Sequence, residues 1–186
     1  MDWNISHPRN AAYLAQVSLV RSGDRVLEVG KGEGIAACLM ASRAAEVDTL
    51  DIDKSKTPVF VGDCSCWDEI KFLKDQYDII FCCQVLEHMS LDDAFRSVKN
   101  LLNLNPNRLV LSFPDNRKTI RAGVSVGSRA FKILLTRPRS GKLVTKANSR
   151  QHCWEIYWKN IEDILNRLRS EHCYELRKHY RLFERP

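Results

Sequence analysis

A short apolar segment that runs directly into a glycine-rich loop restricts the fold of this chain more than any other feature. Residues 25–29, RVLEV, have the length and apolarity of a buried strand. They lead into the loop GKGEG at 30–34, and a helical pattern follows at 35–43. Glycines at alternate positions between a strand and a helix allow a tight turn and bring a ligand close to main-chain N–H groups. A ligand-binding turn is therefore expected here.

The first 114 residues repeat this alternation of strands and helices. Compact apolar segments predict further strands, and helical spacing of apolar residues predicts helices before, between and after them. The strands are expected at 47–52, 59–61, 77–83 and 108–113, and the helices at 11–20, 35–43, 67–74 and 91–102. Strands separated by helices form right-handed βαβ units, which stack into a parallel sheet covered on both faces. We therefore expect an α/β protein, a three-layer αβα sandwich.

The formal net charge of +6 is unevenly distributed along the 186 residues. Residues 1–114 have a balance of −4, residues 115–150 of +9 and residues 151–186 of +1. A localised positive field points to an anionic partner. The glycines and prolines at 115–150 interrupt the alternation of strands and helices. The apolar run within this stretch, at 131–135, is short. We predict a single domain over 1–186 with a basic insertion or lid, and no sheet strand, at 115–150.

The composition of the chain indicates the cellular compartment in which we expect the protein. No apolar run reaches the roughly 20 residues of a membrane-spanning helix, and the N-terminus lacks the apolar stretch of a secretory signal. The seven cysteines are odd in number and form no CxxC pair, which favours reduced thiols and a cytoplasmic location. His152, Cys153, His172 and Cys173 lack the spacing of a four-ligand zinc site, so no metal is predicted.

The glycine loop does not fit the common phosphate-binding patterns. The dinucleotide pattern requires glycine at position 35, where this chain has Ile35, and a Walker A ending is missing. With Glu28 before it, the loop instead resembles motif I of class I S-adenosylmethionine-dependent methyltransferases, which implies a Rossmann-like sheet. The cofactor of that family carries a cationic amino group and a sulfonium, which an acidic side chain at the end of a strand suits.

Three further segments resemble that family in the same order. Asp51 ends the second strand, where an acidic group can bind both ribose hydroxyls, and Asp63 follows the third strand. Residues 77–89, YDIIFCCQVLEHM, resemble the fourth-strand motif, and 108–116 the fifth strand with its proline exit. The resemblance implies that S-adenosyl-L-methionine is bound by Glu28, Gly30, Lys31, Gly32, Gly34, Asp51, Ile52, Asp63, Cys64, Cys83, Gln84 and Val85. Each acidic residue also has a plainer interpretation, as a turn former or a helix cap.

The C-terminal part resembles a subgroup of small methyltransferases of type 11 or 12. HCWEI at 152–156 comes before an expected helix at 154–168, and YRLFERP at 180–186 ends an expected strand that begins near residue 174. The chain ends at Pro186, where the family's seventh, antiparallel strand would begin. Two interpretations stay open: the sheet lacks this strand, or the chain is a truncated member of the family.

Methyl transfer from a sulfonium is an in-line displacement that needs an aligned nucleophile and at most one base. The candidate bases are His88, Asp115 and His152, since the resemblance places each on the substrate side. Lys31 departs from the family pattern, and its side chain is expected to point to solvent or to contact the cofactor carboxylate.

The acceptor stays open between several classes. We expect a small-molecule, glycan or lipid hydroxyl or carboxyl, with the basic stretch 115–150 covering an anionic acceptor. The alternatives are RNA ribose methylation through that stretch, and a non-catalytic binding module with the cofactor fold. Adenine-amino methylation is disfavoured, because Cys83, Gln84 and Val85 stand where those enzymes carry an Asn/Asp-Pro-Pro-aromatic motif. Cytosine-C5 methylation is disfavoured as well, because Cys82, Cys83 and Gln84 lack the proline of the Pro-Cys motif.

Overall fold

The protein is an αβα sandwich around a parallel sheet. The computed structural model describes residues 8–112, 118–126 and 129–137. The main sheet has the strand order β3-β2-β1-β4-β5. Its strands are β1 (Arg25–Val29), β2 (Glu46–Asp51), β3 (Phe60–Val61), β4 (Ile79–Cys83) and β5 (Arg108–Ser112). The helices are α1 (Pro8–Leu19), α2 (Ile35–Met40), α3 (Trp67–Ile70) and α4 (Leu91–Asn103), with 3₁₀ turns η1 (Lys54–Lys56), η2 (Lys71–Leu73) and η3 (Leu86–His88). The predicted fold class is confirmed.

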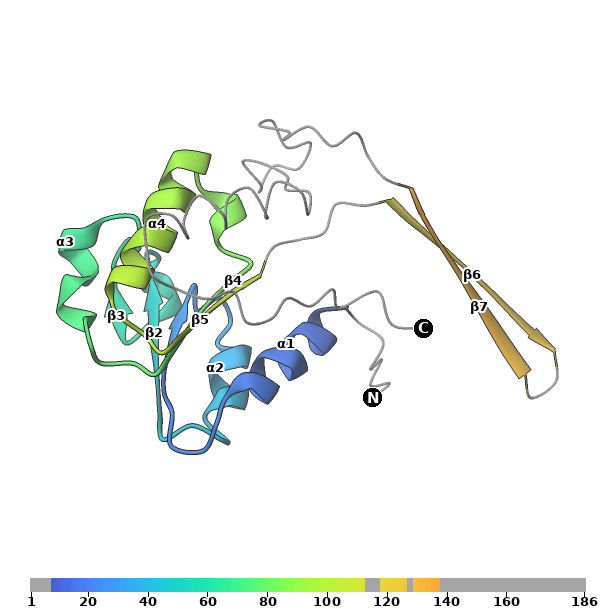
Figure 1. Cartoon of the computed structure of the whole chain (residues 1–186), viewed down its shortest axis with the longest axis horizontal. Helices are drawn as coiled ribbons and strands as arrows, with labels where there is room; N and C mark the ends of the chain where they lie inside the picture. The colour runs from blue at the N-terminus through green and yellow to red at the C-terminus, as the bar shows by residue number, and fades with distance from the viewer. Residues whose placement is uncertain (1–7, 113–117, 127–128, 138–186) are drawn as a thin grey trace.

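The sheet has a separate apolar core on each face. Figure 1 shows α3 and α4 on one side of the sheet and α1 and α2 on the other. Alternate residues of β1 enter the two cores: Leu27 packs in the cluster that contains Leu101 of α4, and Val26 in the cluster that contains Met40 of α2. A strand with both faces covered must be apolar at every position. The charged residue near the end of β1, Glu28, therefore needs a separate explanation.

The strand order locates a crevice at the carboxyl end of the sheet. All four strand pairs of the main sheet are parallel, and β1 lies between β2 and β4. The chain runs from β1 outward through β2 to β3 and then crosses to β4 on the other side. In open sheets of this kind, ligands bind outside the carboxyl ends of the strands where the order reverses. Here that point lies between β1 and β4.

The observed elements lie close to the expected ones, and the differences have local causes. β4 is expected from residue 77 but begins at Ile79, because the two preceding side chains make contacts outside the ladder. The Tyr77 hydroxyl donates to Asp48 at 2.7 Å, and Asp78 accepts from the Arg25 backbone at 3.0 Å. The expected helix at 67–74 is divided into α3 and η2. The acidic start of α4 is confirmed, since the Ser90 hydroxyl accepts from the Asp93 N–H.

The prediction that the basic insertion at 115–150 contains no sheet strand is wrong. β6 (Lys118–Val126) and β7 (Arg129–Arg137) pair as an antiparallel ribbon, in a two-stranded sheet of their own (Figure 1). The sequence held the signal. Apolar residues alternate at 120, 122, 124 and 126, and Gly127 and Ser128 stand between the strands, a pattern typical of a hairpin. The prediction of an insertion or lid relied on the positive charge, glycines and prolines of the stretch and not on this alternation.

Several expected features lie outside the described residues. These are the helix at 154–168, the strand from residue 174, and the candidate bases Asp115 and His152. No helix in the described ranges has the length and apolarity of a bilayer-crossing segment.

The turn between β1 and α2 brings two parts of the sheet into close contact. Gly30 has φ +81, and its N–H donates to the Leu50 carbonyl of β2 at 2.8 Å. A Cβ added at Gly30 would lie 2.2 Å from Cγ2 of Val85, which follows β4. Any other residue at this position would therefore meet both backbone strain and a steric clash.

Replacing Gly30 tests this contact. We expect Gly30→Ala to lower the free energy of unfolding by about 2–5 kcal/mol, because a left-handed conformation and overpacking both oppose the added methyl group. Gly23→Ala is the matched control, since Gly23 has φ +89 but no heavy atom within 4 Å of an added Cβ. Denaturant unfolding should show a smaller loss for the control. Equal losses in the two variants would contradict the role of Val85.

An ion pair joins the edge strand β5 to the turn before β1. Arg108 donates to Asp24 Oδ2 at 2.5 Å and to the Leu19 carbonyl at 2.6 Å. The same Asp24 oxygen accepts from the Arg21 N–H at 2.6 Å, and the Asp24 side chain is only 10% exposed. This carboxylate thus joins the end of α1, the start of β1 and the edge of the sheet.

Removing the Asp24 charge should destabilise the domain. We expect Asp24→Asn to cost about 1.5–3 kcal/mol, because hydrogen bonds between charged, shielded groups contribute more than neutral ones. Glu46→Gln is the control, since its pair with Arg25 is about half exposed and should contribute under about 1 kcal/mol. Thermal unfolding of both variants is the measurement. A control that loses as much as Asp24→Asn would show that shielding is not the cause.

Candidate functional site

The ends of three strands meet around the glycine loop. Glu28 lies near the end of β1, and Asp51 ends the neighbouring β2. The Gly32 N–H donates to Asp51 Oδ2 at 3.3 Å, and Gly30 lies against Val85 after β4. The structure therefore brings together five of the residues that the sequence predicts as cofactor contacts.

Glu28 is a buried acid with an unused oxygen. It is 8% exposed, and its Oε2 has no hydrogen-bond partner among the described residues. Burial is the main cause that raises the pKa of Glu28 to about 7, and the nearby Asp51 carboxylate adds to it. A hydrogen bond from the Ala37 backbone acts in the opposite direction. An orphaned carboxyl oxygen at the end of a strand is suited to a cationic hydrogen-bond donor.

Asp51 is held in place by backbone donors. Its Oδ1 accepts from the Asp53 N–H at 2.9 Å, and its Oδ2 accepts from Gly32. Each carboxylate oxygen can accept more than one hydrogen bond, so both keep room for further donors. The next side chain, Ile52, is 70% exposed and provides an apolar surface beside the carboxylate.

The structure contradicts one of the two expectations for Lys31, a side chain that points to solvent. Its Nζ does not point to solvent but donates to the Lys56 carbonyl at 2.7 Å and to the Thr57 carbonyl at 2.6 Å. It also contacts the Thr57 hydroxyl at 3.1 Å. The ammonium group is therefore engaged by the chain itself. Gly34, the last glycine of the loop, has φ +73 and begins α2 without a side-chain cap.

The remaining predicted cofactor contacts follow the ends of β3 and β4. After β3, Asp63 accepts from the Ser65 N–H at 2.8 Å, and the Cys64 side chain is buried in the core. After β4, Cys83 is half-buried, and burial raises the pKa of its thiol to about 12. Gln84 is exposed, has φ +59 and donates through its backbone to the Ser112 carbonyl at 3.1 Å. These thiols are poor nucleophiles, so the structure favours a packing role for them.

The Glu-His pair after β4 is divided between interior and surface. Glu87 is 1% exposed, and neither carboxyl oxygen has a hydrogen-bond partner in the described part of the chain. Burial raises the pKa of Glu87. His88 is exposed in the same turn, η3. Ser90, and not Glu87, caps the helix that follows, and the sequence did not predict the burial of Glu87.

The burial of Glu28 has a consequence for stability that depends on pH. The pKa of Glu28 is about 7 in the folded protein, above its ordinary value of 4.5. The folded state therefore binds more protons than the unfolded state between these values, and stability falls as pH rises through this window. We expect Glu28→Gln to be more stable than the unmodified protein by about 1–3 kcal/mol above pH 7, and to lose this advantage below pH 4.5.

Unfolding by urea from pH 4.5 to 8 measures this effect. Glu46→Gln, which changes an exposed carboxyl on β2, is the control. A difference between Glu28→Gln and the unmodified protein that stays constant over the whole range would contradict the burial argument.

Comparisons with known proteins agree with this geometry. The profile of a methyltransferase domain family, type 23, matches residues 6–179. Protein-L-isoaspartate O-methyltransferase 2 of Anaeromyxobacter sp. is 43% identical over 49 residues, which is 26% of this chain and 20% of that protein. The cofactor of class I methyltransferases is S-adenosylmethionine, and the cluster of Glu28, the glycine loop and Asp51 fits it.

Solved structures share the fold at low identity. The small RNA methyltransferase HEN1 matches 94% of this chain and 23% of its own, with a TM-score of 0.65 at 16% identity. The cyclase SpnF matches 91% of this chain and 59% of its own, with a TM-score of 0.57 at 16% identity. The YcgJ protein of Bacillus subtilis matches 87% of this chain and 68% of its own, with a TM-score of 0.51 at 16% identity. The chain thus spans about a quarter of HEN1 and a fifth of the isoaspartate enzyme. It belongs to the class I S-adenosylmethionine-dependent methyltransferase family.

Proposed function

We propose that this chain transfers a methyl group from S-adenosylmethionine to an anionic acceptor, with the cofactor at the carboxyl ends of β1 and β2. The observation that carries the proposal is the unpaired, buried Oε2 of Glu28 beside the glycine loop. An unsatisfied buried carboxyl is costly, and a ligand with a cationic donor group relieves that cost. The amino group of the cofactor is such a donor.

Each part of the site has a distinct role in this proposal. Glu28 binds the cofactor's amino group, and Asp51 accepts hydrogen bonds from the ribose hydroxyls. The glycine loop lets the cofactor approach the main chain closely. The flanking contacts come from Ile52, Asp63, Cys64, Cys83, Gln84 and Val85. Lys31 is attached to the Lys56 and Thr57 carbonyls, so it contributes through the loop rather than through a direct charge.

The cofactor supplies the reactive methyl carbon, and the chain's own residues position and shield it. Methyl transfer by displacement requires alignment of the acceptor and exclusion of water more than covalent participation. One base suffices where the acceptor carries a hydroxyl. His88 is a candidate for that base, and it is exposed in η3 just after β4. Asp115 and His152, which lie outside the described residues, remain candidates from the sequence.

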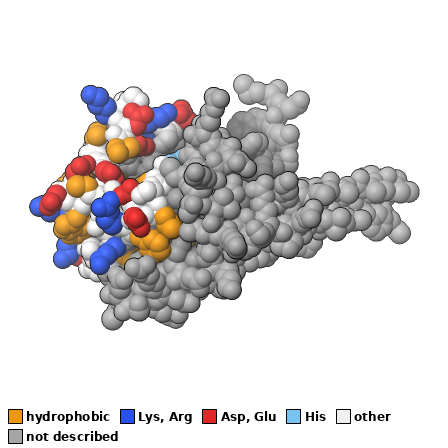
Figure 2. Space-filling view, turned by 90° about the horizontal axis from the view of Figure 1, so that it is seen from above, with side chains coloured by type: hydrophobic (Ala, Val, Ile, Leu, Met, Phe, Trp, Pro, Cys, Tyr) orange, Lys and Arg blue, Asp and Glu red, His pale blue; other side chains and the backbone are white. Residues whose placement is uncertain are grey.

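The charge distribution favours an anionic acceptor. On the face shown in Figure 2, acidic and basic side chains are mixed over the described residues. The excess of +9 lies instead in 115–150, the stretch that contains β6 and β7. We propose that this stretch, within a single domain over 1–186, covers the acceptor. A small-molecule, glycan or lipid acceptor with a hydroxyl or carboxyl group fits such a lid.

RNA is the second candidate acceptor, and the same positive stretch favours it. HEN1 is a small RNA methyltransferase, but the likeness to it extends to the fold alone. Binding through phosphates falls steeply with salt. A third candidate is a binding module without transfer activity. The fold alone does not imply methyl transfer, since SpnF, with a similar fold, is a cyclase.

Cofactor binding tests the first step. We expect Asp51→Asn to weaken binding of S-adenosylhomocysteine by about ten- to a hundredfold, because a hydrogen bond to a charged group contributes about 1.5–3 kcal/mol. Affinity in the unmodified protein should rise as pH increases through 7, because ionised Glu28 is the form that attracts an ammonium group. Titration calorimetry measures both effects, with Glu46→Gln as the control. No binding by the unmodified protein, or unchanged affinity in Asp51→Asn, would overturn the proposed site.

A transfer assay then identifies the acceptor class. Labelled S-adenosylmethionine is incubated with small hydroxyl and carboxyl acceptors, glycans, lipids and RNA, and Asp51→Ala serves as the inactive control. Transfer to RNA that disappears at high salt would favour the second candidate over the first. Cofactor binding without transfer to any acceptor would support the binding module.

A further inference from the structure

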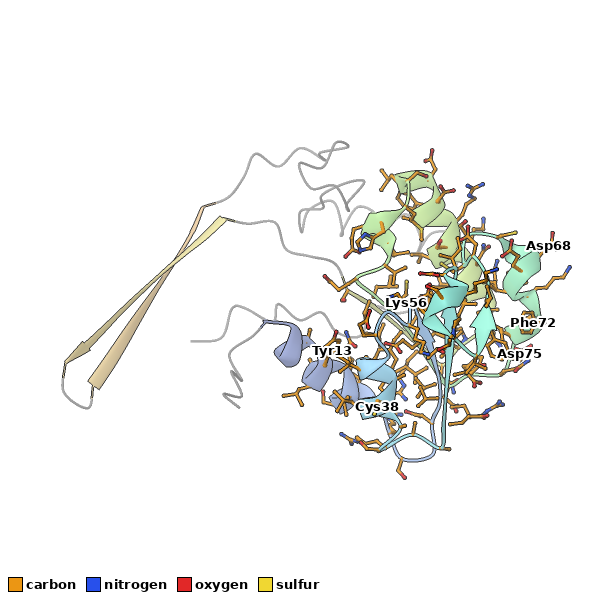
Figure 3. All side chains as sticks on the ribbon, turned by 180° about the vertical axis from the view of Figure 1, so that it is seen from behind. Tyr13, Cys38, Lys56, Asp68, Phe72 and Asp75 are labelled. Carbon is orange, nitrogen blue, oxygen red and sulfur yellow. The ribbon has the colours of Figure 1, made fainter. Side chains whose placement is uncertain are left out.

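Two lysines join the glycine loop to the connection after β2. Lys31, from the glycine loop, donates to the carbonyls of Lys56 and Thr57. Lys56, from that connection, donates in return to Glu33 Oε1 in the glycine loop at 2.8 Å. We call Lys31, Glu33, Lys56 and Thr57 the lysine clasp. Lys56 is labelled in Figure 3, where it lies beside the ribbon of the main sheet.

The Lys31 half of the clasp is the stronger one. An ammonium group has three donors, and three acceptors of Lys56 and Thr57 lie within 3.1 Å of Nζ. Its stem is held close to the loop, since a Cβ added at Gly34 would lie 3.3 Å from Lys31 Cε. These carbonyls end the short turn η1, where Thr57 has φ +49. Carbonyls at such an end lack partners within the turn, so a cation there satisfies them.

The Glu33 half of the clasp is weaker. The side chains of Lys56 and Glu33 are 37% and 79% exposed. Ion pairs with that exposure contribute little, because water screens the charges and both side chains lose rotamer freedom. The two halves therefore provide an internal comparison: they connect the same two segments, but only the Lys31 half has main-chain carbonyls as acceptors.

The carboxylate that we assign to the ribose, Asp51, contacts the same two segments that the clasp joins. Asp51 accepts from Gly32 on one segment and from Asp53 on the other. The bond from Gly32 is 3.3 Å long, beyond the usual range for an amide donor, so it holds the two segments together only weakly. The three short contacts of Lys31 lie on the same two segments and are better suited to fix their separation.

We propose that Lys31 is a positioning residue that sets the separation between the glycine loop and the Asp51 carboxylate before the cofactor binds. The proposal rests on the proposed function for its ligand, and the clasp itself is a property of the free protein. A preorganised site loses less ordering entropy when the ligand binds, so its affinity is higher.

The first measurement is the affinity of the protein for S-adenosylhomocysteine, the product that the cofactor becomes after methyl transfer. We expect Lys31→Met, which keeps the stem and removes the ammonium group, to weaken S-adenosylhomocysteine binding by about tenfold or more, because displaced binding groups lose much of their effect. Glu33→Gln should stay within about twofold, since exposed pairs contribute little. Lys31→Arg should not restore full affinity, because a planar guanidinium cannot reproduce the three contacts. Full affinity in Lys31→Arg would instead indicate a simple charge effect and overturn the proposal.

The second measurement needs no ligand. In the free protein, amide hydrogen exchange of Gly32 and Asp53, the two donors to Asp51, should be about tenfold faster in Lys31→Met and unchanged in Glu33→Gln. Thermal unfolding checks that each variant is folded, and Lys31→Gln replaces Lys31→Met if the latter does not fold.

The two measurements separate failure of the clasp from failure of the proposed function. Unchanged exchange and unchanged affinity in Lys31→Met, or in Lys31→Gln where that variant replaces it, would overturn the clasp, even where the unmodified protein binds S-adenosylhomocysteine. Faster exchange in Lys31→Met, together with no binding by the unmodified protein, would support the clasp and reject the cofactor assignment.

Discussion

The close approach of Gly30 to Val85 is the constraint on which the rest of the site depends. A hydrogen bond from Gly30 to β2 and a contact to the segment after β4 meet at one residue without a side chain. This packing leaves no space for a Cβ, so it fixes how the first turn passes over the sheet. Because β1 lies between β2 and β4, the same contact determines which strand ends face one another. The chemistry of the site therefore begins with a steric requirement.

Stability and function oppose each other in this arrangement. Glu28 and Glu87 are both buried, and three of their four carboxyl oxygens have no partner in the described part of the chain. Buried acids without partners lower stability at neutral pH, since burial disfavours the charged form. Glutamine at position 28 would remove that cost, yet it would also remove the charge that attracts a cation. The acid at the end of β1 is understandable as a ligand-binding group and not as part of a core.

Sequence patterns predicted the main sheet well because each strand carries its own signal. RVLEV is apolar on both faces, and the structure gives β1 the same limits. Asp51 and Glu28 were predicted as cofactor contacts from the resemblance to class I methyltransferases, and the structure places both near strand ends beside the glycine loop. Lys31 could not be assigned in the same way. Its acceptors are main-chain carbonyls some 25 residues away, and a carbonyl has no signature in the sequence. The hairpin β6–β7 also has a sequence signal, the alternation of apolar residues, but the density of positive charge and the glycines and prolines led to the prediction of an insertion or lid without strands.

The engagement of Lys31 also preserves the charge of the site. The residues before position 115 have a balance of −4, and the cofactor's positive groups require a negative surface. A free lysine in the glycine loop would neutralise Glu28 or Asp51. Among the causes that shift the pKa of Glu28, the attraction of Lys31 is the smallest. Binding to the carbonyls of Lys56 and Thr57 directs the ammonium group toward the connection after β2. In the proposed site, Lys31 thus shapes the loop while the two acids keep their negative field, and the excess positive charge of the chain lies elsewhere in the sequence, at residues 115–150.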